Sequence, residues 1–349
     1  MADRVKWAVV GSGGIARRRT IPEGFVGAEG ARLVGVFDVD RETNRAVAKQ
    51  FGVAAYRSLR GALAAEVDAV YLATPAHLHA RQAVACAKAG KHVLCEKPLG
   101  LTVRDARRMA EAFRAAGVTL GTAFMMRLSA QHRAARDMIA RGDLGTPVYG
   151  RAQLSCWYPP IEKAWRQDPA LGGGGSLIDM GGHCIDLLEM FFGDVTAVTC
   201  RTANRAHSYP VEDTAVVMLE FAGGGFGTVD SCFCIPDASS LNRLEIYGSR
   251  GSILAEGTIG QNPAGRMTAF VAAPDGGYDA AQARTESGGL VIDPPAVNTY
   301  RAEIEEFSAA VLAGREPEVS ARLGVRSQEV LAACYRSART GRRVPVPAD

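Results

Sequence analysis

The sequence lacks the features that mark membrane, secreted and nucleic-acid-binding proteins. No apolar run approaches the ~18 residues that a membrane-spanning helix needs. The formal net charge is only +3 over 349 residues, and no long block of one sign offers a surface for nucleic acid. The chain passes from Met1 through Arg4 directly into an apolar segment, without a charged and then apolar leader. We therefore expect a cytoplasmic protein that binds neither nucleic acid nor a membrane.

Cysteine is too sparse for a disulfide-stabilised scaffold. Eight cysteines are spread through apolar segments of the chain, without the density of a small secreted domain. Cys232 and Cys234 alternate as in a strand, and their flanks supply no second cysteine pair or histidine at zinc spacing. We expect most of these side chains to be buried thiols, and we expect no bound metal.

Length and patterning predict two domains, because 349 residues is about twice the usual size of one domain. Up to residue 124, short apolar runs alternate with segments of helical periodicity, which indicates βαβ units and a doubly wound parallel sheet of the α/β class. From residue 125 onward, longer alternating runs are separated by Gly, Asn and Pro clusters, which favours an α+β domain on a mainly antiparallel sheet. The expected domains are residues 1–124 and 125–349.

The expected elements follow from the same periodicities. In the first domain we predict strands at 6–10, 32–37, 69–73, 92–95 and 119–121, and helices at 41–51, 79–89 and 103–115. In the second we predict strands at 147–157, 195–201, 213–221, 225–234 and 241–247, and helices at 129–140, 298–312 and 325–340. Residues 257–294 are rich in small residues and are expected to form loops with marginal strands. Right-handed crossovers would bring the carboxyl ends of the parallel strands to one edge, where ligands bind.

A glycine-rich turn comes directly after the first predicted strand and opens a helical segment; it consists of Gly11, Ser12, Gly13, Gly14, Ile15 and Ala16. That context makes the pattern typical of a dinucleotide-binding, or Rossmann, domain. Gly11 permits the tight turn, Gly13 lets the backbone approach a pyrophosphate, and Ala16 allows close helix packing. Because the helix N-terminus offers unpaired amides to the anion, we expect Gly14 and Ile15 to contact the cofactor as well.

Asp38 follows the second predicted strand and bears on the choice of cofactor. A carboxylate at this place accepts hydrogen bonds from an adenosine ribose and repels a 2′-phosphate, which favours NAD over NADP. Arg41 lies three residues further on and could meet a 2′-phosphate if Asp38 turned away. The alternative role of Asp38 is that of a turn or helix-capping residue.

Polar residues also follow the strands predicted at 69–73 and 92–95. Thr74 can offer hydroxyl and backbone hydrogen bonds near a ribose, and Pro75 stiffens the turn; His79 opens the next helix as a further cofactor contact. Pro98 favours an extended backbone at Lys97, so we expect the Lys97 ammonium to point into the crevice at the carboxyl edge. There it could hydrogen-bond a reacting oxygen and stabilise negative charge. The alternative is a solvated loop lysine.

The second domain carries a histidine and an aspartate that suit proton transfer. Asp179 and His183 are four residues apart in a segment of helical periodicity, so they share one face. Gly181 and Gly182 would each weaken a helix by ~1 kcal/mol, which indicates close approach of a ligand or other backbone. Histidine titrates near neutrality and can take a hydroxyl proton and return it, with Asp179 orienting it or binding a substrate hydroxyl. The alternative for His183 is a satisfied histidine buried at the domain junction.

Together these motifs resemble the glucose-fructose oxidoreductase and inositol dehydrogenase family, known as Gfo/Idh/MocA, nearly end to end. The matching segments are the glycine turn at residues 11–16, Ala73 to His79, the tripeptide Glu96-Lys97-Pro98, Asp179 to His183, and Tyr335 to Gly341. The resemblance implies a Rossmann domain and a C-terminal domain with an open antiparallel sheet, often used in oligomerisation. We therefore expect a homodimer or homotetramer.

The resemblance also implies reversible oxidation of a sugar or polyol hydroxyl with NAD or NADP, with Lys97 and His183 as the catalytic pair and Asp179 assisting. It implies further that Glu96 lies near the nicotinamide ribose, and that Arg127, Trp165 and Arg166 lie near the nicotinamide and substrate. One departure is Ala76, which stands where many members carry asparagine. Any contact made by that amide is absent here.

Three functions are compatible with these residues. The leading hypothesis is an NAD(P)-dependent dehydrogenase or reductase that acts on a sugar, an inositol-like polyol or a sugar derivative. An NAD-dependent glycosidase would use similar residues for transient oxidation, and a nucleotide-sensing regulatory protein would use the fold without the chemistry. Intact Lys97, Asp179 and His183 count against the regulatory protein. Substrate specificity would come from loops around residues 158–168 and 257–298, whose conformations a single sequence does not fix.

Overall fold

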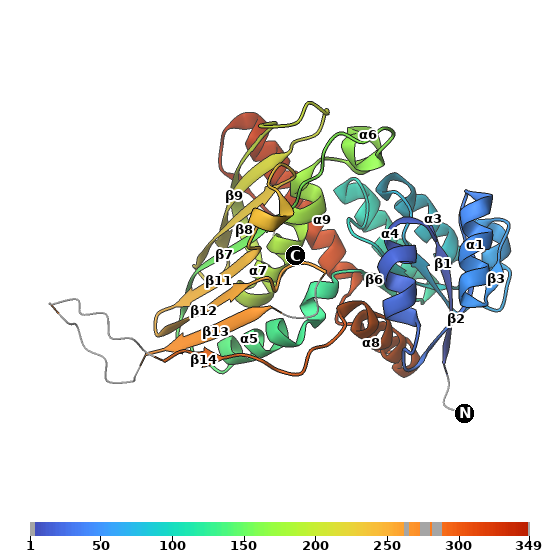
Figure 1. Ribbon diagram of the computed structural model, residues 1–349, viewed down its shortest axis with the longest axis horizontal. Helices are drawn as coiled ribbons and strands as arrows, with labels where there is room; N and C mark the ends of the chain where they lie inside the picture. Colours follow the sequence, from blue (N-terminus) through green and yellow to red (C-terminus); the bar gives the residue numbers. More distant parts are fainter. Residues whose placement is uncertain (1–3, 262–264, 273–279, 281–287, 348–349) are drawn as a thin grey trace.

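The protein has two lobes, each built on its own sheet (Figure 1). The computed structural model describes residues 4–261, 265–272, 280 and 288–347. Part of the segment expected to hold loops with marginal strands, residues 257–294, lies outside the described residues. The N-terminal lobe carries the parallel sheet, and the C-terminal lobe carries the larger sheet.

The sheet of the N-terminal lobe is parallel throughout, which confirms the predicted doubly wound fold. Within the described ranges it has six strands in the order β3-β2-β1-β4-β5-β6. The strands are β1 (Val5–Val10), β2 (Ala31–Phe37), β3 (Ala54–Ala55), β4 (Ala69–Leu72), β5 (His92–Cys95) and β6 (Leu120–Thr122). Since the strand order reverses between β1 and β4, a crevice forms at their carboxyl ends.

Helices cover both faces of this sheet, and three of them begin at a side chain that caps the first turn. They are η1 (Ala16–Phe25), α1 (Arg41–Phe51), α2 (Leu59–Leu63), α3 (Ala76–Lys88) and α4 (Val103–Ala116). The Asp40 side chain accepts from the Thr43 amide at the start of α1, and the Thr102 side chain accepts from the Asp105 amide at the start of α4. β4 is buried along its whole length because helices pack on both of its faces.

The C-terminal lobe holds a mixed sheet that is mainly antiparallel, as predicted. In the described part of the chain it has nine strands in the order β14-β13-β12-β11-β7-β10-β9-β8-β15, with β7 and β10 parallel. The strands are β7 (Pro147–Ser155), β8 (Val195–Ala203), β9 (Thr214–Phe221), β10 (Phe226–Cys232), β11 (Arg243–Gly248), β12 (Gly251–Glu256), β13 (Arg266–Val271), β14 (Leu290–Val291) and β15 (Val344–Pro345).

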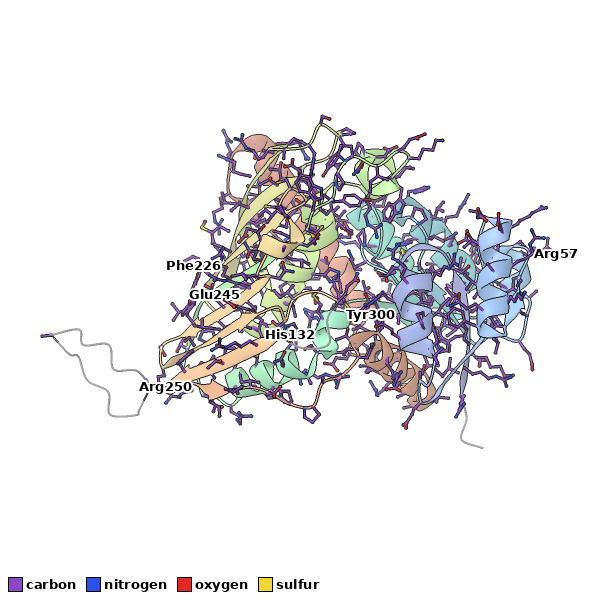
Figure 2. The ribbon with its side chains drawn as sticks, in the orientation of Figure 1. Arg57, His132, Phe226, Glu245, Arg250 and Tyr300 are labelled. Carbon is purple, nitrogen blue, oxygen red and sulfur yellow. The ribbon has the colours of Figure 1, made fainter. Side chains whose placement is uncertain are left out.

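Helices pack on one face of the large sheet and leave the other open (Figure 1). The helices of the lobe are η2 (Met125–Leu128), α5 (Ala130–Ala140), η3 (Trp165–Gln167), α6 (Pro169–Gly172), η4 (Leu177–Gly181), α7 (Gly182–Phe192) and η5 (Asp237–Ser239). Figure 2 shows Phe226 and Glu245 on the open face, where Phe226 is 53% exposed. The core of this lobe therefore lies between the sheet and α7, with Ile185 and Leu188 among its buried residues.

The last two helices connect the lobes. α8 (Thr299–Ala313) returns to the N-terminal lobe, where Phe307 packs against Trp7 at 5.4 Å between ring centroids. The indole Nε1 of Trp7 donates to Ser308 Oγ at 3.0 Å. α9 (Ala321–Thr340) packs against β8 and α4, and Arg107 of α4 pairs with Glu329 of α9. Thus α8 brings residues from the end of the chain beside the parallel sheet.

The cysteines are free thiols, and most of them lie in the interior of the protein. The structure describes all eight cysteines; each is a free thiol, six of them buried and two half-buried. Burial raises the pKa of the Cys86 thiol to about 12, so this side chain is neutral at physiological pH. Over the described ranges, no helix has the length and apolar character required to cross a bilayer.

Candidate active site

A pocket of about 540 Å³ lies between the lobes, at the carboxyl edge of the parallel sheet. The N-terminal lobe contributes Gly14, Ile15, Arg18, Thr74, Glu96 and Lys97 to its wall. The C-terminal lobe contributes Tyr158, Trp165, Arg166, Asp179, His183, Asp237 and Asn242, and α8 contributes Tyr300 and Glu303. The glycine turn and polar residues predicted from both domains therefore line one pocket.

The glycine turn is tight for a steric reason. Gly11 has φ +86°, and a Cβ placed on it would lie 2.7 Å from backbone atoms of Ala73 and Thr74. Gly14 also has a positive φ, and Ala16 is buried at the start of η1. The turn thus brings backbone from β1 against the end of β4 and leaves the first amides of η1 beside the pocket. These features fit a bound dinucleotide.

Asp38 is held against the glycine turn. Its Oδ2 accepts from the Gly13 amide at 3.0 Å, and its Oδ1 accepts from the Asp40 amide at 3.0 Å. Arg41 begins α1 and is exposed. The carboxylate therefore lies at the carboxyl end of β2, where an adenosine ribose would meet it.

The turn after β4 is tied to the turn after β5. Thr74 lines the pocket, and its hydroxyl donates to Gln82 Oε1 at 2.6 Å. Pro75 precedes α3 as its capping residue. His79 is buried, with Nδ1 2.9 Å from the Pro98 carbonyl and Nε2 2.8 Å from the Thr74 carbonyl. His79 was expected to contact the cofactor, but it is not among the residues of the pocket wall; it holds the two turns together.

Lys97 and Asp179 form an ion pair across the lobes. Lys97 Nζ lies 2.9 Å from Asp179 Oδ1 and also donates to the Asp179 main-chain oxygen. Arg166 Nε lies 3.3 Å from the same Oδ1, with its guanidinium 4.4 Å from the Trp165 ring centroid. Burial alone would raise the pKa of Asp179, but the charges of Lys97 and Arg166 hold it well below its ordinary value. Asp179 is therefore an anion that fixes the ammonium in place.

His183 lies next to this ion pair and is neutral. It is 8% exposed, lines the pocket, and packs edge-on against Phe124 at 6.0 Å between ring centroids. Its Nδ1 has no hydrogen-bond partner among the described residues. Burial, and then the positive charge of Lys97, lower the pKa of His183 to about 3. The imidazole is thus held in the form that can accept a proton.

A widened helical turn places Asp179 and His183. The segment η4 is wound as a π-helix, and α7 continues from it at Gly182. A Cβ on Gly181 would lie 3.0 Å from Leu177 Cδ1 and 3.2 Å from Ser231 Oγ of β10. The close approach that the two glycines indicated is therefore packing of Gly181 against β10, and the widened turn is the kind often found at functional sites.

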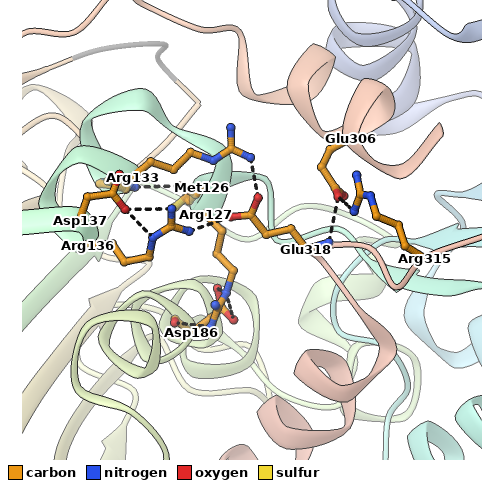
Figure 3. A network of polar contacts seen from close by, with 10 residues as sticks. Met126, Arg127, Arg133, Arg136, Asp137, Asp186, Glu306, Arg315 and Glu318 are labelled. Carbon is orange, nitrogen blue, oxygen red and sulfur yellow. Dashed lines mark hydrogen bonds and ion pairs between the residues drawn. The ribbon is translucent and has the colours of Figure 1, made fainter. Parts of the chain in front are cut away.

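Glu96 and Arg127 have partners within the protein. Glu96 lines the pocket and accepts from the Tyr71 hydroxyl at 2.7 Å, and burial raises the pKa of its carboxyl. Arg127 was expected near the nicotinamide, but its Nε lies 2.9 and 2.8 Å from the two carboxylate oxygens of Asp186 (Figure 3). It ties η2 to α7 and is absent from the pocket wall. Asp186 lies on the same helix as His183 and forms an ion pair with Arg127.

Several residues of the wall were not found by the sequence analysis. Tyr300 and Glu303 belong to α8, and Figure 2 shows Tyr300 between the two lobes. Asp237 and Asn242 come from the segment between β10 and β11. The sequence carried no motif for them, although the N-cap of α8 at Asn298 marks where that helix starts. Within the described ranges, no three His, Cys, Asp or Glu side chains gather as a metal ion would require.

Both lobes of the chain match known protein families. Residues 5–124 match the family described as "Oxidoreductase family, NAD-binding Rossmann fold", and residues 132–254 match "GFO/IDH/MocA C-terminal domain". The chain is 32% identical to a 1,5-anhydro-D-fructose reductase of Ensifer adhaerens over 98% of both chains. It is 30% identical to a D-xylose 1-dehydrogenase (NADP(+)) of Haloferax volcanii, over 97% of this chain and 98% of that one.

A solved structure extends the likeness to the whole fold. The WlbA dehydrogenase from Bordetella pertussis, in complex with NADH and UDP-GlcNAcA, superposes with a TM-score of 0.84 at 25% identity. The match covers 100% of this chain and 99% of that one. Both lobes, and not the dinucleotide-binding sheet alone, are therefore shared with that dehydrogenase.

Proposed function

Since the chain belongs to the Gfo/Idh/MocA family of oxidoreductases, we propose that it transfers a hydride between NAD and a carbon bearing a secondary hydroxyl or carbonyl group. The proposed substrate is a sugar, an inositol-like polyol or a sugar derivative; the reductase of Ensifer adhaerens and the dehydrogenase of Haloferax volcanii are both named for sugar substrates. One observation carries the proposal. Lys97 from one lobe meets Asp179 and His183 from the other in a single pocket, beside the glycine turn.

His183, Lys97 and Asp179 have different roles in the proposed proton transfer. When bound, the nicotinamide would supply or accept the hydride. The neutral imidazole of His183 accepts the hydroxyl proton in oxidation and returns it in reduction. The Lys97 ammonium donates a hydrogen bond to the reacting oxygen and stabilises its developing negative charge. The carboxylate of Asp179 is paired with Lys97 and Arg166, so its role is to orient Lys97.

A substrate panel tests this proposal. Purified protein with NAD and a set of aldoses, ketoses, sugar acids and inositols is expected to show the ultraviolet absorbance of NADH with at least one compound. Tight NAD binding with no absorbance change across the panel would count against hydride transfer to these substrates. Release of an aglycone from a glycoside, with no net formation of NADH, would instead identify the glycosidase reaction.

The preference for NAD over NADP is proposed to rest on Asp38. The Asp38→Asn variant keeps an oxygen that can accept from Gly13 but loses the charge that repels a 2′-phosphate. We expect the ratio of NAD affinity to NADP affinity to fall about ten- to a hundredfold, because a hydrogen bond to a charged group contributes about 1.5–3 kcal/mol. Titration calorimetry with both dinucleotides measures the ratio.

Asp68→Asn provides the matched control for this measurement. Asp68 accepts from the Lys6 amide and directly precedes β4, so it lies at the amino edge of the sheet, away from the pocket. This variant is expected to leave the ratio unchanged. An unaltered ratio in Asp38→Asn would show that the carboxylate does not select the cofactor.

A further inference from the structure

Glu303 of α8 is a buried carboxyl group that the proposed proton chemistry does not use. It is 0% exposed and lines the pocket. Neither of its carboxyl oxygens has a hydrogen-bond partner among the described residues. Burying a polar group without a partner is costly, so such a group in a pocket wall points to a partner that the ligand supplies.

The protonation state of Glu303 limits what that partner can be. Burial, and then the nearby Glu96 and Glu306 carboxyls, raise the pKa of Glu303 well above its ordinary value. This shift favours the neutral carboxylic acid over the carboxylate. A neutral carboxyl offers one O–H donor and one carbonyl acceptor side by side. A primary amide presents the complementary pair, one acceptor and one N–H donor.

The position of Glu303 identifies which part of a dinucleotide it would meet. Asp38 lies at the end of β2, so the adenosine half belongs on that side of the glycine turn. Glu303 shares the pocket wall with Glu96 and Lys97, at the end of β5, and its charge acts on Tyr71 of β4. It therefore lies on the other side of the turn, where the nicotinamide half belongs.

We propose that Glu303 binds the carboxamide of the nicotinamide ring, donating to its oxygen and accepting from its NH₂ group. This inference rests on the proposed function, because it requires a nicotinamide cofactor in the pocket. The helix holds the carboxyl rigidly, since its neighbour Ile304 and the nearby Phe307 are buried in the core of the N-terminal lobe. Glu303 is then a cofactor-binding residue delivered from the end of the chain.

Binding measurements on two variants test the assignment. Glu303→Leu removes both hydrogen-bonding atoms at similar size, and Glu303→Gln keeps a neutral donor and acceptor. We expect Glu303→Leu to weaken NADH binding about tenfold, the size expected for loss of a buried hydrogen bond. ADP-ribose lacks the nicotinamide ring, so its affinity should stay within about twofold of wild type. Glu303→Gln should bind NAD and NADH within about threefold of wild type.

A neighbouring glutamate supplies the control, and the melting temperature checks the fold. Glu305 lies on the same helix and accepts from the Glu29 amide at the surface, so Glu305→Gln should leave all three affinities unchanged. Glu303→Leu should melt no lower than wild type, because it removes a carboxyl with no partner in the described structure. Calorimetric titration with NAD, NADH and ADP-ribose gives the affinities directly.

Three results would overturn the inference. The first is wild-type affinity for NADH in Glu303→Leu. The second is an equal loss of NADH and ADP-ribose binding, which would mean that Glu303 only shapes the groove. The third is weaker binding of NAD, but not of NADH or ADP-ribose, by Glu303→Gln. That result would mean that an anionic Glu303 attracts the positive nicotinamide ring. Failure of the substrate panel would leave these binding results intact, so the two proposals can fail separately.

Discussion

Replacing Lys97 with methionine is expected to lower kcat about 10³-fold while leaving NAD affinity close to that of wild type. Methionine preserves most of the length of the side chain and removes the ammonium, which lies 2.9 Å from Asp179 Oδ1. The reacting oxygen then loses its cationic donor, and the loss applies most strongly to the transition state, where negative charge develops. Arg166 still pairs with Asp179, so the carboxylate keeps one cationic partner.

The control for Lys97 lies at the other end of the same strand. Lys91 precedes β5 and donates to the Val67 carbonyl at 2.7 Å, whereas Lys97 follows β5. Lys91→Met should therefore turn over substrate at the wild-type rate. Steady-state kinetics with the best substrate of the panel, together with calorimetric titration of NAD, separates kcat from cofactor binding. Wild-type turnover by Lys97→Met would remove the lysine from the mechanism.

Replacing His183 with asparagine is expected to lower kcat by roughly 10²- to 10⁴-fold, the usual contribution of a general acid or base. The imidazole lines the same pocket as the Lys97–Asp179 ion pair and is neutral, so it can take a proton. His132 is a matched control, because it is also buried and its pKa is lowered to about 4, again by burial. It lies on α5 with Nδ1 2.8 Å from the Met126 carbonyl (Figure 2), and His132→Asn should change stability more than kcat.

The pH profile supplies an independent check on His183. A pKa of about 3 means that the imidazole stays neutral as the pH falls from 8 to about 5, so His183 should cause no loss of oxidation rate over that range. In Lys97→Met the nearby positive charge is gone, so the pKa of His183 should rise and the acid limb should move to higher pH. An acid limb near the ordinary histidine pKa in the wild-type protein would contradict the neutral, buried imidazole.

The sequence alone was enough to predict the parallel sheet, the glycine turn and the residues that carry the family resemblance. These features are local. The periodicity of strands and helices can be recognised from consecutive residues. A tight turn from a strand into a helix requires a glycine, and Gly11 meets that requirement here. The same reasoning placed Lys97, Asp179 and His183 as the chemical group, and all three line one pocket.

Only the tertiary structure decided the partners of side chains that are distant in the sequence. Arg127 was expected at the cofactor, but packing of η2 on α7 gives it Asp186 as a partner. His79 was expected there too, and packing of α3 against the end of β5 sets it between two carbonyl groups instead. The sequence pattern predicts neither the partner of Arg127 nor that of His79, because the direction of a side chain depends on what packs around its helix.

Glu303 is a pocket residue that the sequence did not predict. Nothing near it in the sequence marks a cofactor contact, since its helix is more than 200 residues beyond the glycine turn. It reaches the pocket because α8 buries Phe307 against Trp7 of β1, and apolar burial has no preference for sequence distance. Local sequence patterns therefore determined the helices, the strands and the motif residues. Burial of residues distant in the sequence decided which side chains face the pocket and which form ion pairs or hydrogen bonds with each other.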